Sequence, residues 1–77
     1  MRIKIFPPLG CDRSALDAKS WAEMPEGSTV SDVLKLIKCN PVKAKLLLVS
    51  VNGERARFSK ELHDGDVVGF FSLVTGG

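Results

Sequence analysis

Hydrophobic and charged residues alternate at the start of the chain. In residues 2–6, Ile3 and Ile5 are separated by charged neighbours, which is typical of a half-buried strand with one face in the core. The Pro7-Pro8 pair ends this strand, because neither proline can donate a hydrogen bond to a neighbouring strand. A weaker alternation over residues 17–24 predicts a second strand after an intervening loop.

The clearest helix signal begins at Thr29. Thr29 and Asp32 have the spacing of a capping box, in which a hydroxyl and a carboxylate satisfy the first free backbone N–H groups. The Asn40-Pro41 pair ends the predicted helix, because proline disfavours helical geometry in the residue before it. The apolar stripe of this helix has i, i+3, i+4, i+7 spacing and consists of Val30, Val33, Leu34 and Ile37.

A hairpin and a last strand complete the pattern. The apolar run of residues 46–51 leads directly into Asn52-Gly53, a strong signal for a two-residue hairpin turn. The return strand, residues 54–58, is short and charged, as suits a sheet edge. Residues 67–74 form the last strand, which we expect to pair with residues 2–6 at the centre of the sheet.

These elements predict an α+β fold in which one main helix crosses a mixed sheet. The helix stripe is expected to pack on apolar strand residues, namely Ile3, Ile5, Val49, Val51, Val68 and Phe70. Truncation of Leu34 to alanine in such a core costs roughly 2–5 kcal/mol.

The composition places the chain among small globular domains. It has 77 residues, 44% of them hydrophobic, and a formal net charge of +2. So small a charge gives no indication of a nucleic-acid partner, and the six Lys and Arg residues at 35, 38, 43, 45, 55 and 57 are interpreted as a solvated face. No apolar run reaches the roughly 20 residues of a membrane span, and the N-terminus lacks the apolar segment of a secretory signal. We therefore expect a cytoplasmic protein without a membrane partner.

The residue types that carry most enzymatic chemistry are sparse. Cys11 and Cys39 are far apart in the sequence and outside any metal-binding spacing, so we interpret them as free thiols, Cys39 packing in the helix and Cys11 inert in a loop. His63 lies in a polar turn with Asp64 and Asp66, and an Asp-Gly-Asp sequence between strands is much more typical of a turn than of a cation site. No metal or bound cofactor is expected.

The Gly76-Gly77 end of the chain is the strongest candidate for chemistry. Glycines make a thin peptide that a narrow channel can admit, and no Cβ crowds the terminal carbonyl. Since the chain ends at the second glycine, no processing is expected to be needed to expose this carboxylate. The alternative is a frayed terminus that happens to be glycine-rich.

With these residues, the sequence resembles the ubiquitin-like sulfur carriers, the family of ThiS and the small subunit of molybdopterin synthase (MoaD). The resemblance covers essentially the whole chain. The matching segments keep the family's order and spacing: Ile3-Lys4-Ile5-Phe6, Glu26-Gly27-Ser28-Thr29-Val30, Val51-Asn52-Gly53-Glu54, Leu62-His63-Asp64-Gly65-Asp66, Phe70-Phe71 and Gly76-Gly77.

The resemblance implies a β-grasp domain over residues 1–74 and a flexible tail over residues 75–77. It also implies that a ubiquitin-activating-type adenylating enzyme uses ATP to activate the terminal carboxylate, which then becomes a thiocarboxylate. Gly77 would bear the sulfur, while Gly76 and Thr75 would support insertion of the tail. The sulfur acceptor would be the large subunit of molybdopterin synthase or another acceptor enzyme.

Alternation along the last strand adds a partner surface. Because Val68 and Phe70 point to the helix, Phe71 and Leu73 should point away from it and contact the partner enzyme. The alternative is that they form a second small core beneath residues 9–16.

Several functions remain open on the sequence. The leading interpretation is sulfur donation in molybdenum- or tungsten-cofactor synthesis. The others are sulfur donation for thiamin thiazole or thioamino-acid synthesis, protein modification through an isopeptide bond at Gly77, and a β-grasp interaction module whose two terminal glycines have no chemical role.

Overall fold

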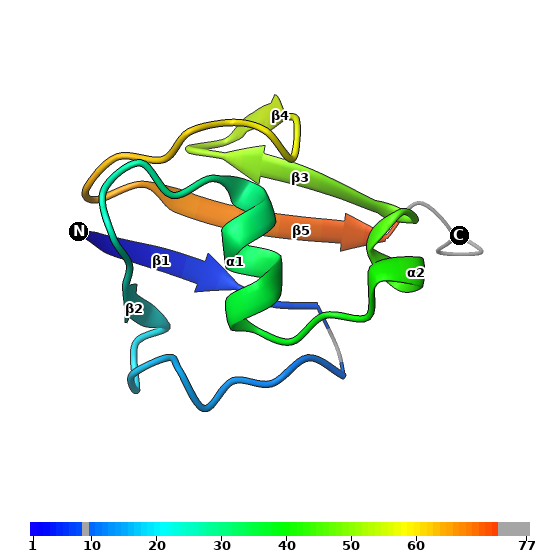
Figure 1. Cartoon of the computed structure of the whole chain (residues 1–77), viewed down its shortest axis with the longest axis horizontal. Helices are drawn as coiled ribbons and strands as arrows, with labels where there is room; N and C mark the ends of the chain where they lie inside the picture. The colour runs from blue at the N-terminus through cyan, green and yellow to red at the C-terminus, as the bar shows by residue number, and fades with distance from the viewer. Residues whose placement is uncertain (9, 73–77) are drawn as a thin grey trace.

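A computed structural model describes residues 1–8 and 10–72 of the chain. The strands form one sheet in the order β2-β1-β5-β3-β4, and helix α1 crosses one face of it (Figure 1). The strands are β1 (Arg2–Phe6), β2 (Trp21–Glu23), β3 (Leu47–Val51), β4 (Glu54–Ala56) and β5 (Val67–Ser72), and the helices are α1 (Val30–Leu36) and α2 (Pro41–Ala44). The predicted α+β architecture, a mixed sheet crossed by one main helix, is confirmed.

The first and last strands lie side by side at the centre of the sheet. Strand β5 runs parallel to β1, with Ile5 opposite Val68, and antiparallel to β3, with Val49 opposite Phe70. This central pairing is the one that the sequence predicted. It places the end of the described chain, Ser72, on a strand with a neighbour on each side.

The core lies between α1 and the sheet. Its fully buried side chains include residues from the helix stripe, from the strands and from the loop before β5, namely Ile3, Ile5, Val30, Val33, Ile37, Leu62 and Val68. Val49 and Val51 are also buried, and Phe70 is half-buried against the same cluster. The predicted packing of the helix stripe is therefore confirmed, with Phe70 at the margin of the core.

We expect Leu34→Ala to lower the free energy of unfolding by about 2–3 kcal/mol, the low end of the usual range for such truncations. The low end applies because Leu34 keeps 9% of its surface exposed and so lies at the periphery of the core. Urea denaturation measures this change, and Val42→Ala, at a position 72% exposed, is the control that should shift stability by less than about 0.5 kcal/mol. Equal effects at the two positions would contradict the packing.

Helix α1 begins as predicted and ends earlier than predicted. At its start, the Asp32 carboxylate accepts a hydrogen bond from the Thr29 backbone N–H at 2.9 Å, so the capping box is present. At its end, Lys38 has a φ of 52°, a conformation that stops a helix. The Cys39 N–H donates to the Leu34 carbonyl at 3.0 Å, and the Lys38 N–H donates to the Lys35 carbonyl. These two hydrogen bonds form the Schellman pattern of helix termination.

The Asn40-Pro41 pair begins the short helix α2, and the prediction that this pair ends the main helix was wrong. The Asn40 side chain accepts a hydrogen bond from the Val42 N–H at 2.8 Å and caps α2. Proline is favoured at the first position of a helix, where its missing N–H is not needed. Cys39 consequently lies between the two helices and not within one, as the sequence had suggested.

The strands other than β1 also depart from their predicted bounds. Strand β2 covers only the last part of the predicted segment, because the Asp17 carboxylate accepts hydrogen bonds from the backbone N–H groups of Lys19 and Trp21 and holds the first part in a turn. Strand β3 begins one residue after the predicted segment and β4 ends two residues before its predicted end. The predicted end of β5 and the predicted domain boundary after residue 74 lie outside the described residues.

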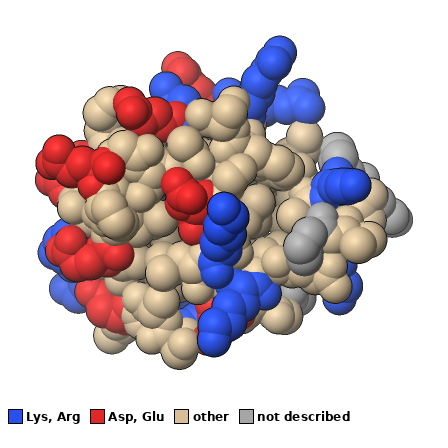
Figure 2. All heavy atoms as spheres, viewed as in Figure 1, with Lys and Arg blue, Asp and Glu red and all other residues tan. Residues whose placement is uncertain are grey.

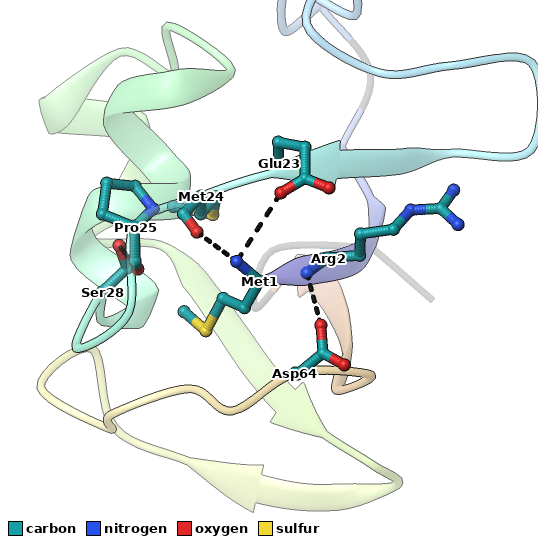
Figure 3. A network of polar contacts seen from close by, with 7 residues as sticks. All are labelled: Met1, Arg2, Glu23, Met24, Pro25, Ser28 and Asp64. Atoms are coloured by element: carbon teal, nitrogen blue, oxygen red, sulfur yellow. Dashed lines mark hydrogen bonds and ion pairs between the residues drawn. The ribbon is translucent and has the colours of Figure 1, made fainter.

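Polar contacts fix the end of the sheet where the chain begins (Figure 3). The Met1 ammonium donates to the Met24 carbonyl at 2.8 Å and lies 3.6 Å from the Glu23 carboxylate. The Arg2 N–H donates to Asp64 Oδ1 at 2.7 Å. These contacts join β1 to the end of β2 and to the turn that precedes β5. No described helix is long and apolar enough to cross a membrane.

Candidate functional site

The face of the sheet opposite α1 carries two exposed aromatic side chains. Phe6 on β1 is 50% exposed and Phe71 on β5 is 59% exposed. The prediction that Phe71 points away from the helix is confirmed, and its exposure contradicts the alternative of a second core beneath residues 9–16. Its role in partner binding stays a prediction. Leu73, the other residue predicted for this surface, lies outside the described residues.

A glycine opens a hollow beside these rings. Gly69 lies opposite Phe6 on one neighbouring strand and opposite Ser50 on the other. A Cβ on Gly69 would lie 3.2 Å from Ser50 Oγ and 3.8 Å from the Phe71 ring, so a side chain here would fill the space beside the ring. The resulting open hollow, of about 380 Å³, is bordered by Phe6 and Phe71 and also by Phe70. It can receive an apolar side chain of a partner.

Cations border the aromatic surface on the β1–β2 side. The Lys4 ammonium lies 5.4 Å from the centre of the Phe6 ring and 5.9 Å from that of Trp21. The Arg2 guanidinium lies 5.1 Å from the Trp21 ring centre. All three distances suit cation–π interactions, which hold the two charges on the open face. We call this surface, made of Arg2, Lys4, Phe6, Trp21, Gly69 and Phe71, the open-face patch.

Charge is unevenly distributed along the molecule. Acidic side chains gather at the end where the chain begins, and near α2, at the other end, the charged side chains in view are basic (Figure 2). Lys43 and Lys45, in and just after α2, are both exposed. The described end of β5 lies at this basic end (Figure 1).

The turn before β5 is held by carboxylates that accept backbone and amide hydrogen bonds. Asp66 accepts from the Asn52 side-chain amide and from the His63 N–H, each at 2.9 Å. Burial by itself raises the pKa of Asp66, but these hydrogen bonds, together with the positive charges of His63 and Lys60, outweigh it and leave the pKa below its ordinary value of 3.8. The interpretation of this segment as a turn is confirmed. Among residues 1–8 and 10–72, no group of three or more His, Cys, Asp or Glu is placed to hold a metal ion.

We expect Asp66→Asn to lower the free energy of unfolding by about 1–2 kcal/mol at neutral pH, the usual size of a hydrogen-bond effect at a charged group. A carboxyl group with a lowered pKa in the folded state stabilises the fold above its unfolded pKa, and this contribution is lost as the pH falls through the folded pKa. The difference between the two proteins should therefore vanish in acid. Urea midpoints measured as a function of pH test this, with Glu54→Gln, at an exposed carboxylate on β4, as the control. A difference that persists in acid would contradict it.

The structure places one of the predicted site residues, Phe71, and reveals others that the sequence interpretation missed. Thr75, Gly76 and Gly77 lie outside the described residues. The missed residues are the rest of the open-face patch, namely Arg2, Lys4, Phe6, Trp21 and Gly69. The alternation that put Ile3 and Ile5 in the core also puts Lys4 and Phe6 on the opposite face, so a signal for these two was present. The role of Gly69 depends on its neighbours across two strands and had no signal.

Comparisons with known proteins agree with this architecture. The ThiS family model matches residues 12–77. A solved structure described as a putative molybdopterin converting factor, subunit 1, from Pyrococcus furiosus is 30% identical, with a TM-score of 0.60 over 95% of each chain. The crystal structure of SAMP1 from Haloferax volcanii is 22% identical, with a TM-score of 0.58 over 99% of this chain and 97% of that one, and supports the fold. No curated protein matches the sequence.

Proposed function

This chain belongs to the ThiS family of ubiquitin-like sulfur carriers, and we propose that it carries its sulfur as a thiocarboxylate on Gly77 for molybdopterin biosynthesis, as the small subunit of molybdopterin synthase. The observation that carries the pathway is the 30% identity to a putative molybdopterin converting factor subunit over 95% of both chains. The family match extends to the last residue and so includes both glycines.

The chemistry needs only the terminal carboxylate from this chain. A carboxylate is a poor electrophile, so the activating enzyme first joins it to AMP from ATP and releases pyrophosphate. A sulfur nucleophile, hydrosulfide or an enzyme-bound equivalent, then attacks the carbonyl carbon of Gly77 and displaces AMP. The product is a thiocarboxylate, whose sulfur is itself nucleophilic and reacts with the substrate held by the acceptor enzyme.

The open-face patch provides the docking surface in this proposal. Two exposed rings and the hollow at Gly69 offer an apolar centre, and Lys4 offers positive charge at its border. Arg2 also lies at this border, where its guanidinium pairs with the Asp17 carboxylate at 3.2 Å. Such an arrangement suits a partner with an apolar side chain ringed by acidic groups. Because Phe71 lies on β5, docking at the patch occurs on the same strand that leads toward the tail.

The test combines activation and transfer. The chain is incubated with the adenylating enzyme of its own cell, ATP and sulfide, and its intact mass is followed for replacement of one oxygen by sulfur. The product is then mixed with the large synthase subunit and the molybdopterin precursor. We expect molybdopterin to form. Sulfur loading followed by transfer only to a thiazole-forming enzyme would overturn the pathway, and absence of loading would overturn the thiocarboxylate mechanism.

A further inference from the structure

The fold brings together two cysteines that are distant in the sequence. Cys11 follows the first strand and Cys39 lies between the helices, and both are free and half-buried. Their segments are held side by side by a hydrogen bond from the Asp12 N–H to the Ile37 carbonyl at 2.8 Å. A contact of 3.4 Å between the Lys38 ammonium and the Asp12 carboxylate adds to this. The two thiols are therefore neighbours through tertiary structure.

Both thiols line the same open cavity, of about 770 Å³, at the α2 end of the molecule. Lys43 and Lys38 contribute to its wall, with Leu47 and Phe70 as its apolar part. A cavity of this size and openness to solvent admits a small sulfur compound. The site is distinct from the open-face patch, because neither thiol lines the hollow at Gly69 and Phe71 does not line this cavity, although Phe70 borders both.

The thiols also influence each other. The pKa of Cys11 is raised to about 11, mainly by burial and also by the neighbouring Cys39, while the positive charge of Lys43 opposes the rise. Both thiols line one cavity, on two segments that the Asp12–Ile37 hydrogen bond joins, and such proximity is the first geometric condition for a disulfide.

We propose that Cys11 and Cys39 form a redox-active dithiol site, which closes into a reversible intramolecular disulfide by exchange with a small disulfide such as oxidised glutathione. This is a modification site in addition to the terminal glycine. The reaction needs neither the tail nor the activating enzyme.

The exchange proceeds in two balanced steps. The Cys39 thiol loses its proton to water and its thiolate attacks one sulfur of glutathione disulfide, so that a mixed disulfide forms and one glutathione thiolate leaves. The Cys11 thiolate then attacks the Cys39 sulfur, and the second glutathione leaves. Each departing thiolate takes up a proton. Two protein thiols are oxidised to one disulfide, and one glutathione disulfide is reduced to two thiols.

Cys39 is the better first nucleophile because the high pKa of Cys11 makes its thiolate scarce at neutral pH. Once Cys39 has become a mixed disulfide, the positive charge of Lys43 on the same cavity wall still favours the Cys11 thiolate that attacks it.

The experiment equilibrates the full chain with oxidised glutathione, traps free thiols with an alkylating reagent and records the intact mass. Groups held together in one fold react at effective concentrations of millimolar or more, and reduced glutathione is what reopens the internal disulfide. With about 0.1 mM reduced glutathione present beside the oxidised form, the internal disulfide should therefore outnumber the mixed disulfide by roughly tenfold. The expected product is a monomer that has lost two hydrogens and takes up no alkylating reagent. Cys11→Ser and Cys39→Ser, the matched variants, should each stop at a mixed disulfide.

The wild-type chain supplies a control that does not depend on the variants folding. Concentrated urea unfolds the chain and separates the two thiols, so the proportion of internal disulfide should fall and mixed disulfides should accumulate. Equal amounts of internal disulfide with and without urea would overturn the proposal, because the fold would then have no part in pairing the thiols. Mixed disulfides on both cysteines of the folded chain, or a disulfide-linked dimer as the main product, would overturn it as well.

Discussion

Deletion of Gly77 is expected to abolish ATP-dependent conversion of the chain to a thiocarboxylate. The carboxylate would then end one residue short of the nucleotide in a channel that fixes the reacting geometry, and a displacement of about 1 Å already costs on the order of 100-fold in rate. One extended residue corresponds to roughly 3.3–3.6 Å. The measurement is the intact mass after incubation with the activating enzyme, ATP and a sulfur source.

Two further variants separate the causes of this loss. Gly77→Ala keeps the length and the terminal carboxylate, so it should retain part of the activity that the deletion loses. Gly76→Val also keeps the length but should fail, because its Cβ crowds the channel and restricts φ. The deletion should leave the free energy of unfolding unchanged within about 0.5 kcal/mol. Conversion of the shortened chain at the rate of the intact one would show that the two terminal glycines have no role in the chemistry.

Phe71→Asp should weaken binding to the activating enzyme by roughly 30- to 1,000-fold, which corresponds to about 2–4 kcal/mol for an aromatic anchor at the centre of an interface. The change removes the larger of the two exposed ring surfaces and places a negative charge beside the hollow at Gly69. That charge would face the acidic groups expected on the partner. Titration calorimetry or surface plasmon resonance with the activating enzyme measures the loss.

Val42→Asp is the matched control for this variant. Val42 is the same kind of exposed apolar residue, 72% exposed, but it lies on α2 and outside the open-face patch. We expect its affinity for the enzyme to equal that of the wild type. Phe71→Asp should also change the free energy of unfolding by less than about 1 kcal/mol, since its main cross-strand neighbour is Leu48. If both aspartate variants bind equally well, the patch is not the docking surface.

The centre of the fold was predictable because several local signals agree there. Ile3 and Ile5 alternate with charged residues, Asn52-Gly53 specifies a tight hairpin, and Asp32 caps the helix. Each of these signals depends on residues close in sequence, and tertiary packing reinforces all of them. The β1–β5 pairing followed because the end strands are among the most apolar.

The connection from α1 to β3 was less predictable, because its residues have two competing uses. A proline can end one helix or begin another, and the sequence neighbours of Pro41 do not decide between these uses. Lys38 adopts a positive φ, which lysine rarely does, so the sequence did not predict that α1 ends there. The hydrogen bonds from the Lys38 and Cys39 N–H groups to carbonyls of α1 stabilise this helix end.

The sites were predictable where they depend on alternation and unpredictable where they depend on distant contacts. Phe71 could be assigned to the open face from the period of its own strand. The proximity of Cys11 and Cys39 could not be anticipated, since it arises from the hydrogen bond between Asp12 and Ile37. Sequence spacing carries no information about a contact of this kind.

The central position of β5 has a consequence for how the protein is made. Synthesis at about 5–20 residues per second takes roughly 4–15 s for 77 residues, and β1 emerges from the ribosome before β5. Its parallel partner β5 is completed only when Ser72 has been added, so the nascent chain lacks the strand that joins the two halves of the sheet. A chain interrupted before that point loses the middle of its sheet, and not merely an edge. The nascent chain can therefore adopt the native fold only after the last strand has been translated.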